Sequence, residues 1–197
     1  MVEFTTDLQK AASCIKAGGV AVCPSEGVYG ISCLARDDKA VRRVIAIKER
    51  DSSKGLITVA SSESQLEGLW DEGAIAQSSR ALMRRLWPGP FTFVVPCTND
   101  FKASVLTGKR GTIAVRLTAF ETLRELCDLC GEALVTTSAN LSGSAAVSDF
   151  DLISPLILKR VDLALSLPCQ GLGGASSVYD TLRGKLIRRG PDWPEDL

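Results

Sequence analysis

The sequence predicts a single α/β domain, built on an open, twisted mixed sheet that is flanked by helices. Three observations support this fold class. Apolar residues switch along the chain between helical spacing and short continuous runs, which indicates helices alternating with buried strands. No segment repeats with a period of 20–50 residues, and no low-complexity linker divides the 197 residues. Polar loops directly follow several strands, which is where open α/β sheets place their ligands.

The N-terminal half is expected to contain four helices and three strands. Apolar residues at helical spacing follow Asp7 and stop at Gly18-Gly19, which predicts the first helix. Ser62 with Gln65 resembles a capping box and predicts a helix that runs through Trp70. In chain order the elements are a helix from Leu8 to about Gly18, a strand at 20–23, a helix at 38–48, a strand at 56–60, helices at 62–70 and 81–86, and a strand at 91–95.

The C-terminal half is expected to contain five strands and two helices. Thr118 and Glu121 form a second capping box, which opens a helix that extends to about Cys130. Two apolar runs separated by Leu182-Arg183-Gly184 predict a closing hairpin. The elements are strands at 112–117, 133–137, 163–167, 177–181 and 185–188, a helix at 118–130, and a helix at 151–160 that Pro155 interrupts.

The chain contains no histidine. A Ser-His-Asp or Cys-His nucleophile, a histidine general base and a histidine-ligated metal site are therefore excluded. Hydrophobic residues make up 45% of the chain and charged residues 23%, which is typical of a folded globular protein.

The seven cysteines show no framework of regular spacings, and several lie in apolar runs such as 20–23. Such usage is typical of core thiols in a reducing compartment. Cys127 and Cys130 are expected on one face of a helix, and a thioredoxin-like redox role is the alternative. A zinc site there would need two further ligands, so no metal site is expected. Glu3 and Asp7 lie early in the chain and no long apolar stretch follows, so no signal peptide is expected. No apolar run approaches the roughly 20 residues of a membrane span. A soluble cytoplasmic protein without membrane contact is therefore expected.

The net charge of zero conceals a division of charge along the sequence. Residues 80–116 carry seven basic side chains and one acidic side chain, a local sum of +6, and residues 42–54 add +3. A face that gathers these charges would attract a polyanion or a nucleotide, because the local field is what acts on a partner. Solvated helix faces produce similar runs, so charge alone leaves both interpretations open.

Two familiar nucleotide motifs fail, and four polar segments remain. Gly108-Lys109 is not a P-loop, because Ala103 stands at the first glycine position and Arg110 at the Ser/Thr position. Gly171-Leu172-Gly173 has Ser176 where a dinucleotide fingerprint needs a third glycine. The remaining segments, each beside a strand or helix end, are 24–30, 48–55, 136–143 and 170–177. Each one alone also suits an ordinary turn, a helix cap or a surface loop.

Taken together, the polar segments resemble the YrdC-like family of threonylcarbamoyl-AMP synthases, in its short, single-domain form. The landmarks are Pro24-Ser25-Glu26-Gly27-Val28-Tyr29-Gly30, Lys48-Glu49-Arg50, Lys54-Gly55-Leu56, Trp87-Pro88-Gly89-Pro90-Phe91-Thr92, Ala114-Val115-Arg116 and Ser138-Ala139-Asn140-Leu141-Ser142-Gly143. The resemblance implies the YrdC-like, double-stranded-RNA-binding-like fold over residues 1–190, followed by a short tail at 191–197. It also implies that L-threonine, bicarbonate and ATP with Mg²⁺ are converted to threonylcarbamoyl-AMP and pyrophosphate, for N6-threonylcarbamoyladenosine modification of tRNA.

The resemblance also assigns roles to individual residues. Lys48, Arg50 and Ser138 are implied to be catalytic. Nucleotide contacts are implied for Lys48, Arg50, Lys54, Thr112, Asn140, Ser148 and Arg188, and L-threonine contacts for Ser25, Arg116, Ser138 and Ser176. The chain departs from the family pattern at three positions: Asp51 replaces a proline after K-x-R, Val59 stands where longer relatives carry a threonine-contacting histidine, and Arg189 replaces a proline before Gly190.

Three functions remain open on the sequence. The first is the ATP-dependent synthase, which would hand its adenylate to the proteins of a threonylcarbamoyl-transferase complex. The second is a non-catalytic module that binds double-stranded RNA or tRNA, favoured by the +6 segment. The third is a related carbamoyl-transfer maturation domain, although such domains usually lie in much longer chains.

Overall fold

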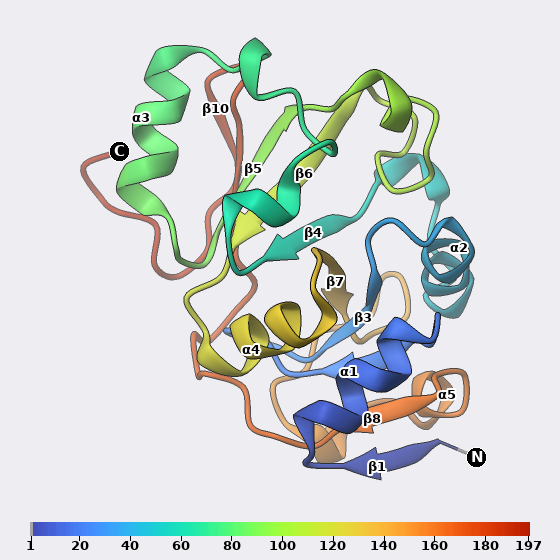
Figure 1. Ribbon diagram of the computed structural model, residues 1–197. Coiled ribbons are helices and arrows are strands. Elements are labelled where there is room, and N and C mark those ends of the chain that lie inside the picture. The colour runs from blue at the N-terminus through green and yellow to red at the C-terminus, as the bar shows by residue number, and fades with distance from the viewer. Residues whose placement is uncertain (1) are drawn as a thin grey trace.

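The computed structural model describes residues 2–197, and ten strands of this region form one mixed sheet. Figure 1 shows the sheet running through the molecule, with the N-terminus beside β1 and the C-terminus beside α3. The strand order across the sheet is β1-β8-β2-β3-β7-β4-β6-β5-β9-β10. The strands are β1 (Glu3–Thr5), β2 (Ala21–Cys23), β3 (Gly30–Leu34), β4 (Ile57–Ala60), β5 (Phe91–Pro96), β6 (Thr112–Leu117), β7 (Leu134–Ser138), β8 (Leu163–Leu165), β9 (Ser177–Asp180) and β10 (Lys185–Arg188).

Parallel and antiparallel pairs mix within this sheet, as the sequence predicts. The pairs β1·β8, β2·β8, β4·β6 and β5·β9 are parallel, whereas β2·β3, β3·β7, β4·β7, β5·β6 and β9·β10 are antiparallel. Strand β7 therefore lies between β3 and β4, although about 75 residues separate it from β4 in the chain. This insertion brings the loop after β7 close to the loops that surround β4 and β6.

Helices cover both faces of the sheet and enclose two apolar cores (Figure 1). On one face, α1 (Leu8–Lys16) and α4 (Glu121–Cys130) pack against each other and against β2, β4 and β8. The helices α2 (Asp38–Ile47), α3 (Gln77–Leu86) and α5 (Pro155–Leu158) contribute to the second, larger core. The fold class and its mixed sheet are therefore confirmed.

Local signals explain where most helices begin and end. The side chain of Asp7 accepts hydrogen bonds from the backbone amides of Gln9 and Lys10, which satisfies two of the free amides at the start of α1. Asp37 caps α2 in the same way through Ala40. Gly131 ends α4 in a left-handed conformation with a φ of 78°, which glycine adopts without strain.

Two predicted helices differ from those in the structure. The segment predicted as a helix to Trp70 contains only a 3₁₀ turn at Glu63–Leu66, because Ser62 makes no capping hydrogen bond and the Gln65 side chain accepts from the amide of Ser61 instead. The segment at 151–160 divides into a 3₁₀ turn at Phe150–Leu152 and the single turn of α5, since Pro155 starts a new helix.

Two strands were not predicted from the sequence. Strand β1 has three residues, too few for periodicity to register, and it pairs only with β8 at the edge of the sheet. Strand β3 is buried from Gly30 to Cys33 and shows no alternation, and its glycine weakened the strand signal. The predicted strands at 112–117 and 185–188 agree with β6 and β10 residue for residue.

The residues after Gly190 pack against the domain through one aromatic side chain. Trp193 is 5% exposed, and its ring stacks on Tyr179 of β9 with 5.9 Å between the ring centroids. Phe91 of β5 meets the same indole edge-on. Within residues 2–197, no helix has the length and apolar character that crossing a membrane requires.

We expect Leu134→Ala to lower the free energy of unfolding by about 2–5 kcal/mol, because the substitution leaves a cavity at a fully buried position of β7. Leu182→Ala is the matched control, since Leu182 is 58% exposed, and its effect should lie within about 0.5 kcal/mol. Urea denaturation of both variants measures these changes. Equal destabilisation by the two substitutions would contradict the assignment of β7 to the core.

Candidate active site

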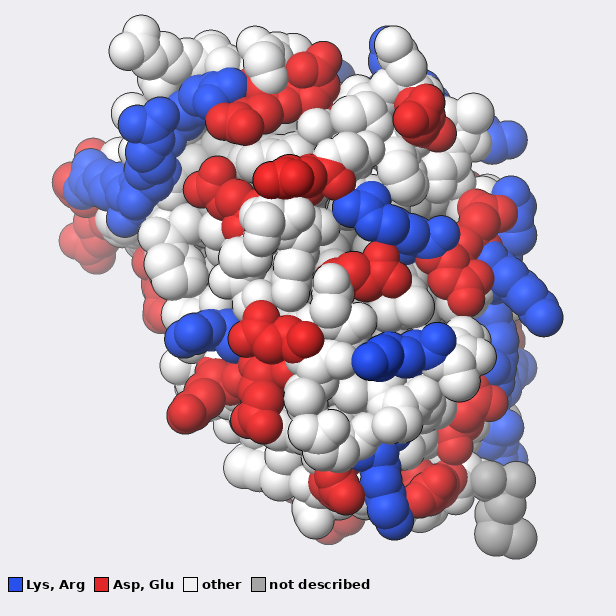
Figure 2. All heavy atoms as spheres, viewed as in Figure 1, with Lys and Arg blue, Asp and Glu red and all other residues white. Residues whose placement is uncertain are grey.

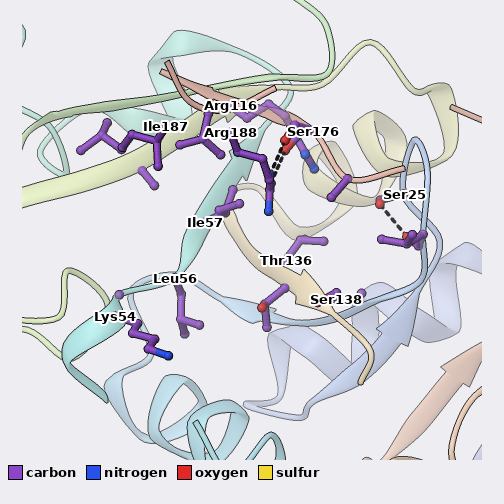
Figure 3. Close-up of a pocket in the computed structure, with 18 of the residues that line it drawn as sticks. Ser25, Lys54, Leu56, Ile57, Arg116, Thr136, Ser138, Ser176, Ile187 and Arg188 are labelled. Atoms are coloured by element: carbon purple, nitrogen blue, oxygen red, sulfur yellow. Dashed lines mark hydrogen bonds between the residues drawn. The ribbon is translucent and has the colours of Figure 1, made fainter. Parts of the chain in front are cut away.

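A cavity of about 360 Å³ opens beside the central strands, and every strand in the middle of the sheet contributes to it. Its lining comes from the turn after β2, the loops around β4 and β6, the end of β7, and β9 with the loop before it (Figure 3). The polar lining residues are Ser25, Glu26, Arg50, Lys54, Thr107, Arg110, Thr112, Arg116, Thr136, Thr137, Ser138, Ser176 and Arg188. A volume of this size suits a small-molecule ligand.

One end of the cavity carries two arginines and a serine. Arg116 of β6 is 5% exposed, and Arg188 of β10 donates from Nε to the carbonyl of Ser176 at 2.8 Å. The Ser176 hydroxyl lies 3.1 Å from the Thr92 hydroxyl. Arg188 Nη2 also donates to the Ser176 hydroxyl, at 3.4 Å. Figure 3 shows Arg116, Arg188 and Ser176 grouped together above β7. Burial and the nearby charge of Arg116 lower the pKa of Arg188, so the two guanidinium groups repel each other across this end.

The opposite end carries three further cations: Arg50, Lys54 and Arg110. Arg50 donates to the carbonyl of Gly55 at 3.1 Å, and its buried Nε has no partner among the described residues. Burial and the charge of Arg110 lower the pKa of Arg50. The charge of the exposed Asp51 acts in the opposite direction on Arg50. Such clustered positive charge favours a multiply charged anion.

A close contact between two loops places Arg110 beside Arg50. Gly108 has a φ of 63°, and a Cβ at this position would lie 2.4 Å from the carbonyl oxygen of Ser53. Only glycine permits this approach. The amide of Leu56 donates to the carbonyl of Leu106 at 2.9 Å and holds the two loops together. The segment that fails as a P-loop therefore has a structural role that brings a cation into the cavity.

A second close contact shapes the side of the cavity that Ser25 lines. A Cβ on Gly27 would lie 1.8 Å from the carbonyl oxygen of Gly174, so the glycine-rich loop rests directly on the turn after β2. Backbone hydrogen bonds from Gln170 to Ser25 and from Leu172 to Glu26 fix this arrangement. The Ser25 hydroxyl donates to the carbonyl of Val28 at 2.6 Å and lines the cavity.

Lys48 does not line the cavity but holds the loop after β7. Its ammonium group donates to the carbonyl oxygens of Ser138 and Asn140, the latter at 2.8 Å, and to the Asn140 side-chain oxygen at 3.4 Å. The residue is 2% exposed, and burial followed by the charge of Arg50 lowers its pKa to about 8. The Asn140 amide nitrogen donates to the carbonyls of Leu141 and Ser144. Lys48 and Asn140 thus fix the loop that presents Ser138.

The structure brings most of the predicted site residues together in this cavity. Those that line it are Ser25, Arg50, Lys54, Thr112, Arg116, Ser138, Ser176 and Arg188. Lys48 and Asn140 lie behind its wall, and Ser148 is exposed on the loop that follows. Their ligand contacts stay predictions.

Two charged lining residues were missed at the sequence level. Glu26 stands inside the Pro24–Gly30 landmark, where the acidic residue between serine and glycine was a usable signal. Arg110 had no local signal, because only the packing of Gly108 brings it to Arg50.

Val59 lies next to Arg116 in the sheet. Strands β4 and β6 pair so that these two residues are register partners, and Val59 is fully buried among α1 and α4 residues. Apolar packing therefore occupies the position at which longer relatives are expected to carry histidine.

Cys127 and Cys130 are both buried on α4, as expected for core thiols. Burial raises the pKa of Cys127 beyond its usual range and that of Cys130 to about 11, which disfavours the reactive thiolate. The capping role predicted for Thr118 is also corrected: its hydroxyl accepts from the amide of Phe120 and donates to Glu26, and α4 starts without a side-chain cap.

The chain belongs to the Sua5/YciO/YrdC family, whose model carries the description "telomere recombination" and matches residues 13–190. A protein of Idiomarina loihiensis named threonylcarbamoyl-AMP synthase is 36% identical over 180 residues, which cover 91% of this chain and 96% of that protein. The resemblance found in the sequence is thereby confirmed.

Solved structures agree with the family assignment. The crystal structure of P. abyssi Sua5 complexed with L-threonine is 28% identical and superposes with a TM-score of 0.85 over 96% of this chain. The present chain spans 57% of the length of that Sua5 chain. The E. coli YciO structure, with a TM-score of 0.81 and 24% identity, shares the fold over 96% of both chains.

Two lysines near the cavity are expected to respond differently to the same substitution. Lys48→Met leaves buried carbonyl oxygens without their donor and should lower the free energy of unfolding by about 1–3 kcal/mol. Lys54→Met removes an exposed cation and should leave stability within about 0.5 kcal/mol, while binding of inorganic pyrophosphate weakens. Thermal denaturation and calorimetric titration measure both effects. A fully stable Lys48→Met variant with weakened pyrophosphate binding would instead make Lys48 a direct phosphate ligand.

Proposed function

We propose that this chain is an L-threonylcarbamoyladenylate synthase, which converts L-threonine, bicarbonate and ATP to threonylcarbamoyl-AMP and pyrophosphate. The observation that carries the proposal is a single cavity with two separate groups of cations. Arg116 and Arg188 suit a carboxylate and one phosphate, whereas Arg50, Lys54 and Arg110 suit a chain of phosphates. The names of the relatives and the L-threonine bound by P. abyssi Sua5 support the same substrates.

The two ends are spaced for an amino acid and a nucleotide that meet between them. Thr112 and Arg116 lie four residues apart on β6, and both line the cavity, so they are separated by about 13 Å. Arg116 binds the threonine carboxylate, and Ser25, Ser138 and Ser176 offer hydroxyl groups to the rest of the molecule. Arg50, Lys54 and Arg110 bind the triphosphate. The α-phosphate then lies towards Arg188, next to the carbamate oxygen that attacks it.

Placement and charge supply the catalytic effect in this proposal. The unprotonated amine of threonine attacks carbon dioxide with loss of a proton, or bicarbonate with loss of water, to give a carbamate. The carbamate oxygen then attacks the α-phosphorus, and pyrophosphate leaves. Holding these groups in line lowers the entropic part of the barrier. The cations at the phosphate end stabilise the negative charge that develops on the leaving pyrophosphate. No protein nucleophile is required, which agrees with a chain that contains no histidine.

Mg²⁺ enters as part of the ATP substrate. No cluster of three or more acidic, cysteine or histidine side chains suited to a metal is present in residues 2–197, and Glu26 is the one acidic side chain in the cavity lining. A divalent cation bound to the phosphate oxygens would neutralise charge that Arg50, Lys54 and Arg110 do not reach.

Transfer to tRNA requires partners that accept the adenylate, namely proteins of a threonylcarbamoyl-transferase complex. The tRNA itself, or double-stranded RNA, is a further proposed ligand. On the face shown in Figure 2, basic and acidic side chains alternate over the surface, so this face presents no continuous track for a nucleic-acid backbone. The cytoplasm is the compartment that such a role implies.

The decisive experiment is a product assay with ATP, Mg²⁺, L-threonine and labelled bicarbonate. We expect a labelled acyl-adenylate and one pyrophosphate per product, with both signals absent when threonine is omitted. Chelation of Mg²⁺ should abolish turnover, and addition of Mg²⁺ should restore it. Pyrophosphate release that ignores threonine, or none with all substrates present, would refute the proposal. Salt-sensitive binding of RNA without turnover would favour the non-catalytic module instead.

Charge-conserving substitutions should separate the two ends of the cavity. Arg116→Lys keeps the positive charge but loses the planar fork that binds a carboxylate, so the KM for threonine should rise about 10- to 100-fold. Arg50→Lys should raise the KM for ATP and leave that for threonine within about threefold. Steady-state kinetics with each substrate varied in turn measures the two constants. Identical effects of both variants on both substrates would contradict separate subsites.

A further inference from the structure

Glu26 is a buried carboxylate that the proposed reaction does not use. It is 2% exposed, it lies in the turn after β2, and its side chain reaches across to β6. Among the lining residues in the described part of the chain it carries the one negative charge, against five positive charges. A carboxylate in this position requires partners, because an unpaired buried charge is strongly unfavourable.

Both carboxylate oxygens of Glu26 meet side chains of β6 and the loop that follows it. Oε1 accepts a hydrogen bond from the Thr118 hydroxyl at 2.7 Å, and Oε2 forms an ion pair with Nη2 of Arg116 at 3.1 Å without the alignment of a hydrogen bond. Thr118 is fully buried, and its hydroxyl oxygen accepts from the amide of Phe120. The Thr118 hydroxyl therefore directs its proton at Glu26. This hydrogen bond holds the Glu26 side chain in one orientation towards Arg116.

The charges at this end of the cavity are left one short of balance. Arg116 and Arg188 carry two positive charges and Glu26 supplies one negative charge, so a net positive charge remains at this end for an anionic ligand group. Arg116 still has donors to offer, and its Nε has no partner within residues 2–197. Without Glu26, the two guanidinium groups would repel each other with no compensation, and Arg116 could leave its buried position.

We infer that Glu26 is the positioning residue of the amino-acid subsite: it holds Arg116 in the orientation that binds the ligand carboxylate, and Thr118 holds Glu26. The inference rests on the proposed function and names the residues that make its threonine subsite. Glu26 acts through Arg116 rather than on the reacting atoms, because Oε1 accepts from Thr118 and Oε2, which has no hydrogen-bond donor within residues 2–197, is ion-paired with the Arg116 guanidinium group. The nucleotide end, formed by Arg50, Lys54 and Arg110, does not depend on it.

The test is Glu26→Gln, with both substrates varied and with threonine and ATP binding measured separately by calorimetry. We expect the KM and the dissociation constant for threonine to rise at least about tenfold, as for loss of a charged contact. The constants for ATP should stay within threefold, which also shows that the variant is folded. The kcat at saturating threonine should stay within threefold. A large fall in kcat with an unchanged KM for threonine would make Glu26 a proton acceptor and overturn the inference.

Thr118 supplies a second, milder test with its own control. It does not line the cavity, so Thr118→Val removes the hydrogen bond to Glu26 without touching a ligand. Its KM for threonine should rise about threefold or more, whereas Thr118→Ser, which keeps the hydroxyl, should match the wild type. A Thr118→Val variant with wild-type threonine binding would overturn the inference, even where Glu26→Gln fails to fold.

The failure of the inference can be told from failure of the proposed function. A wild-type chain that neither binds threonine nor forms product refutes the proposed function, and the inference falls with it. A wild type that turns over while Glu26→Gln keeps the wild-type KM for threonine refutes the inference alone.

Discussion

The constraint on which the site depends is the burial of Arg116 near the middle of a ten-stranded sheet. A guanidinium group can be held there only if another buried group balances its charge, and Glu26 does so from a turn far away in the sequence. The ion pair ties the turn after β2 to β6, although β3, β7 and β4 lie between these strands. The glycine-rich loop at 170–177 packs on the same turn. The ion pair between Glu26 and Arg116 therefore also fixes the position of this part of the cavity wall.

Backbone contacts extend the same arrangement to the end of the cavity that carries Arg50, Lys54 and Arg110. Gly27 against Gly174 and Gly108 against Ser53 are approaches that any side chain would block, and each brings a loop over the cavity. Lys48 adds a third contact from behind the cavity wall, since its ammonium group donates to carbonyl oxygens of the loop after β7. A lysine so enclosed stabilises the loop's shape directly and affects ligands through Ser138. The lysine of the K-x-R motif and the arginine two residues later thus occupy different positions, one behind the wall and one in it.

Much of the fold could be predicted from the sequence, because it depends on local patterns. Strand β6 and helices α1 and α2 follow from periodicity and from caps such as Asp7. Strand β3 was not predicted, since Gly30 and Ser32 interrupt its apolar run. For the site, the motifs identified most lining residues, but Arg110 and Glu26 gain their roles from contacts between distant segments. The same reason explains why Lys48 could be recognised from its motif while its hydrogen bonds to the carbonyl oxygens of Ser138 and Asn140 could not.

The missing histidine limits how protons can move in this cavity. With Lys48 enclosed behind the wall, the lining within residues 2–197 offers no base other than the Glu26 carboxylate, which is ion-paired with Arg116 and hydrogen-bonded to Thr118. The proton of the threonine ammonium group must then leave to water or to bicarbonate before the amine attacks. As the pH rises towards the pKa of the threonine α-amino group, a larger fraction of the threonine carries the unprotonated amine that reacts. Turnover at limiting threonine should therefore depend on pH through the substrate's ionisation, with no bell-shaped contribution from a protein base.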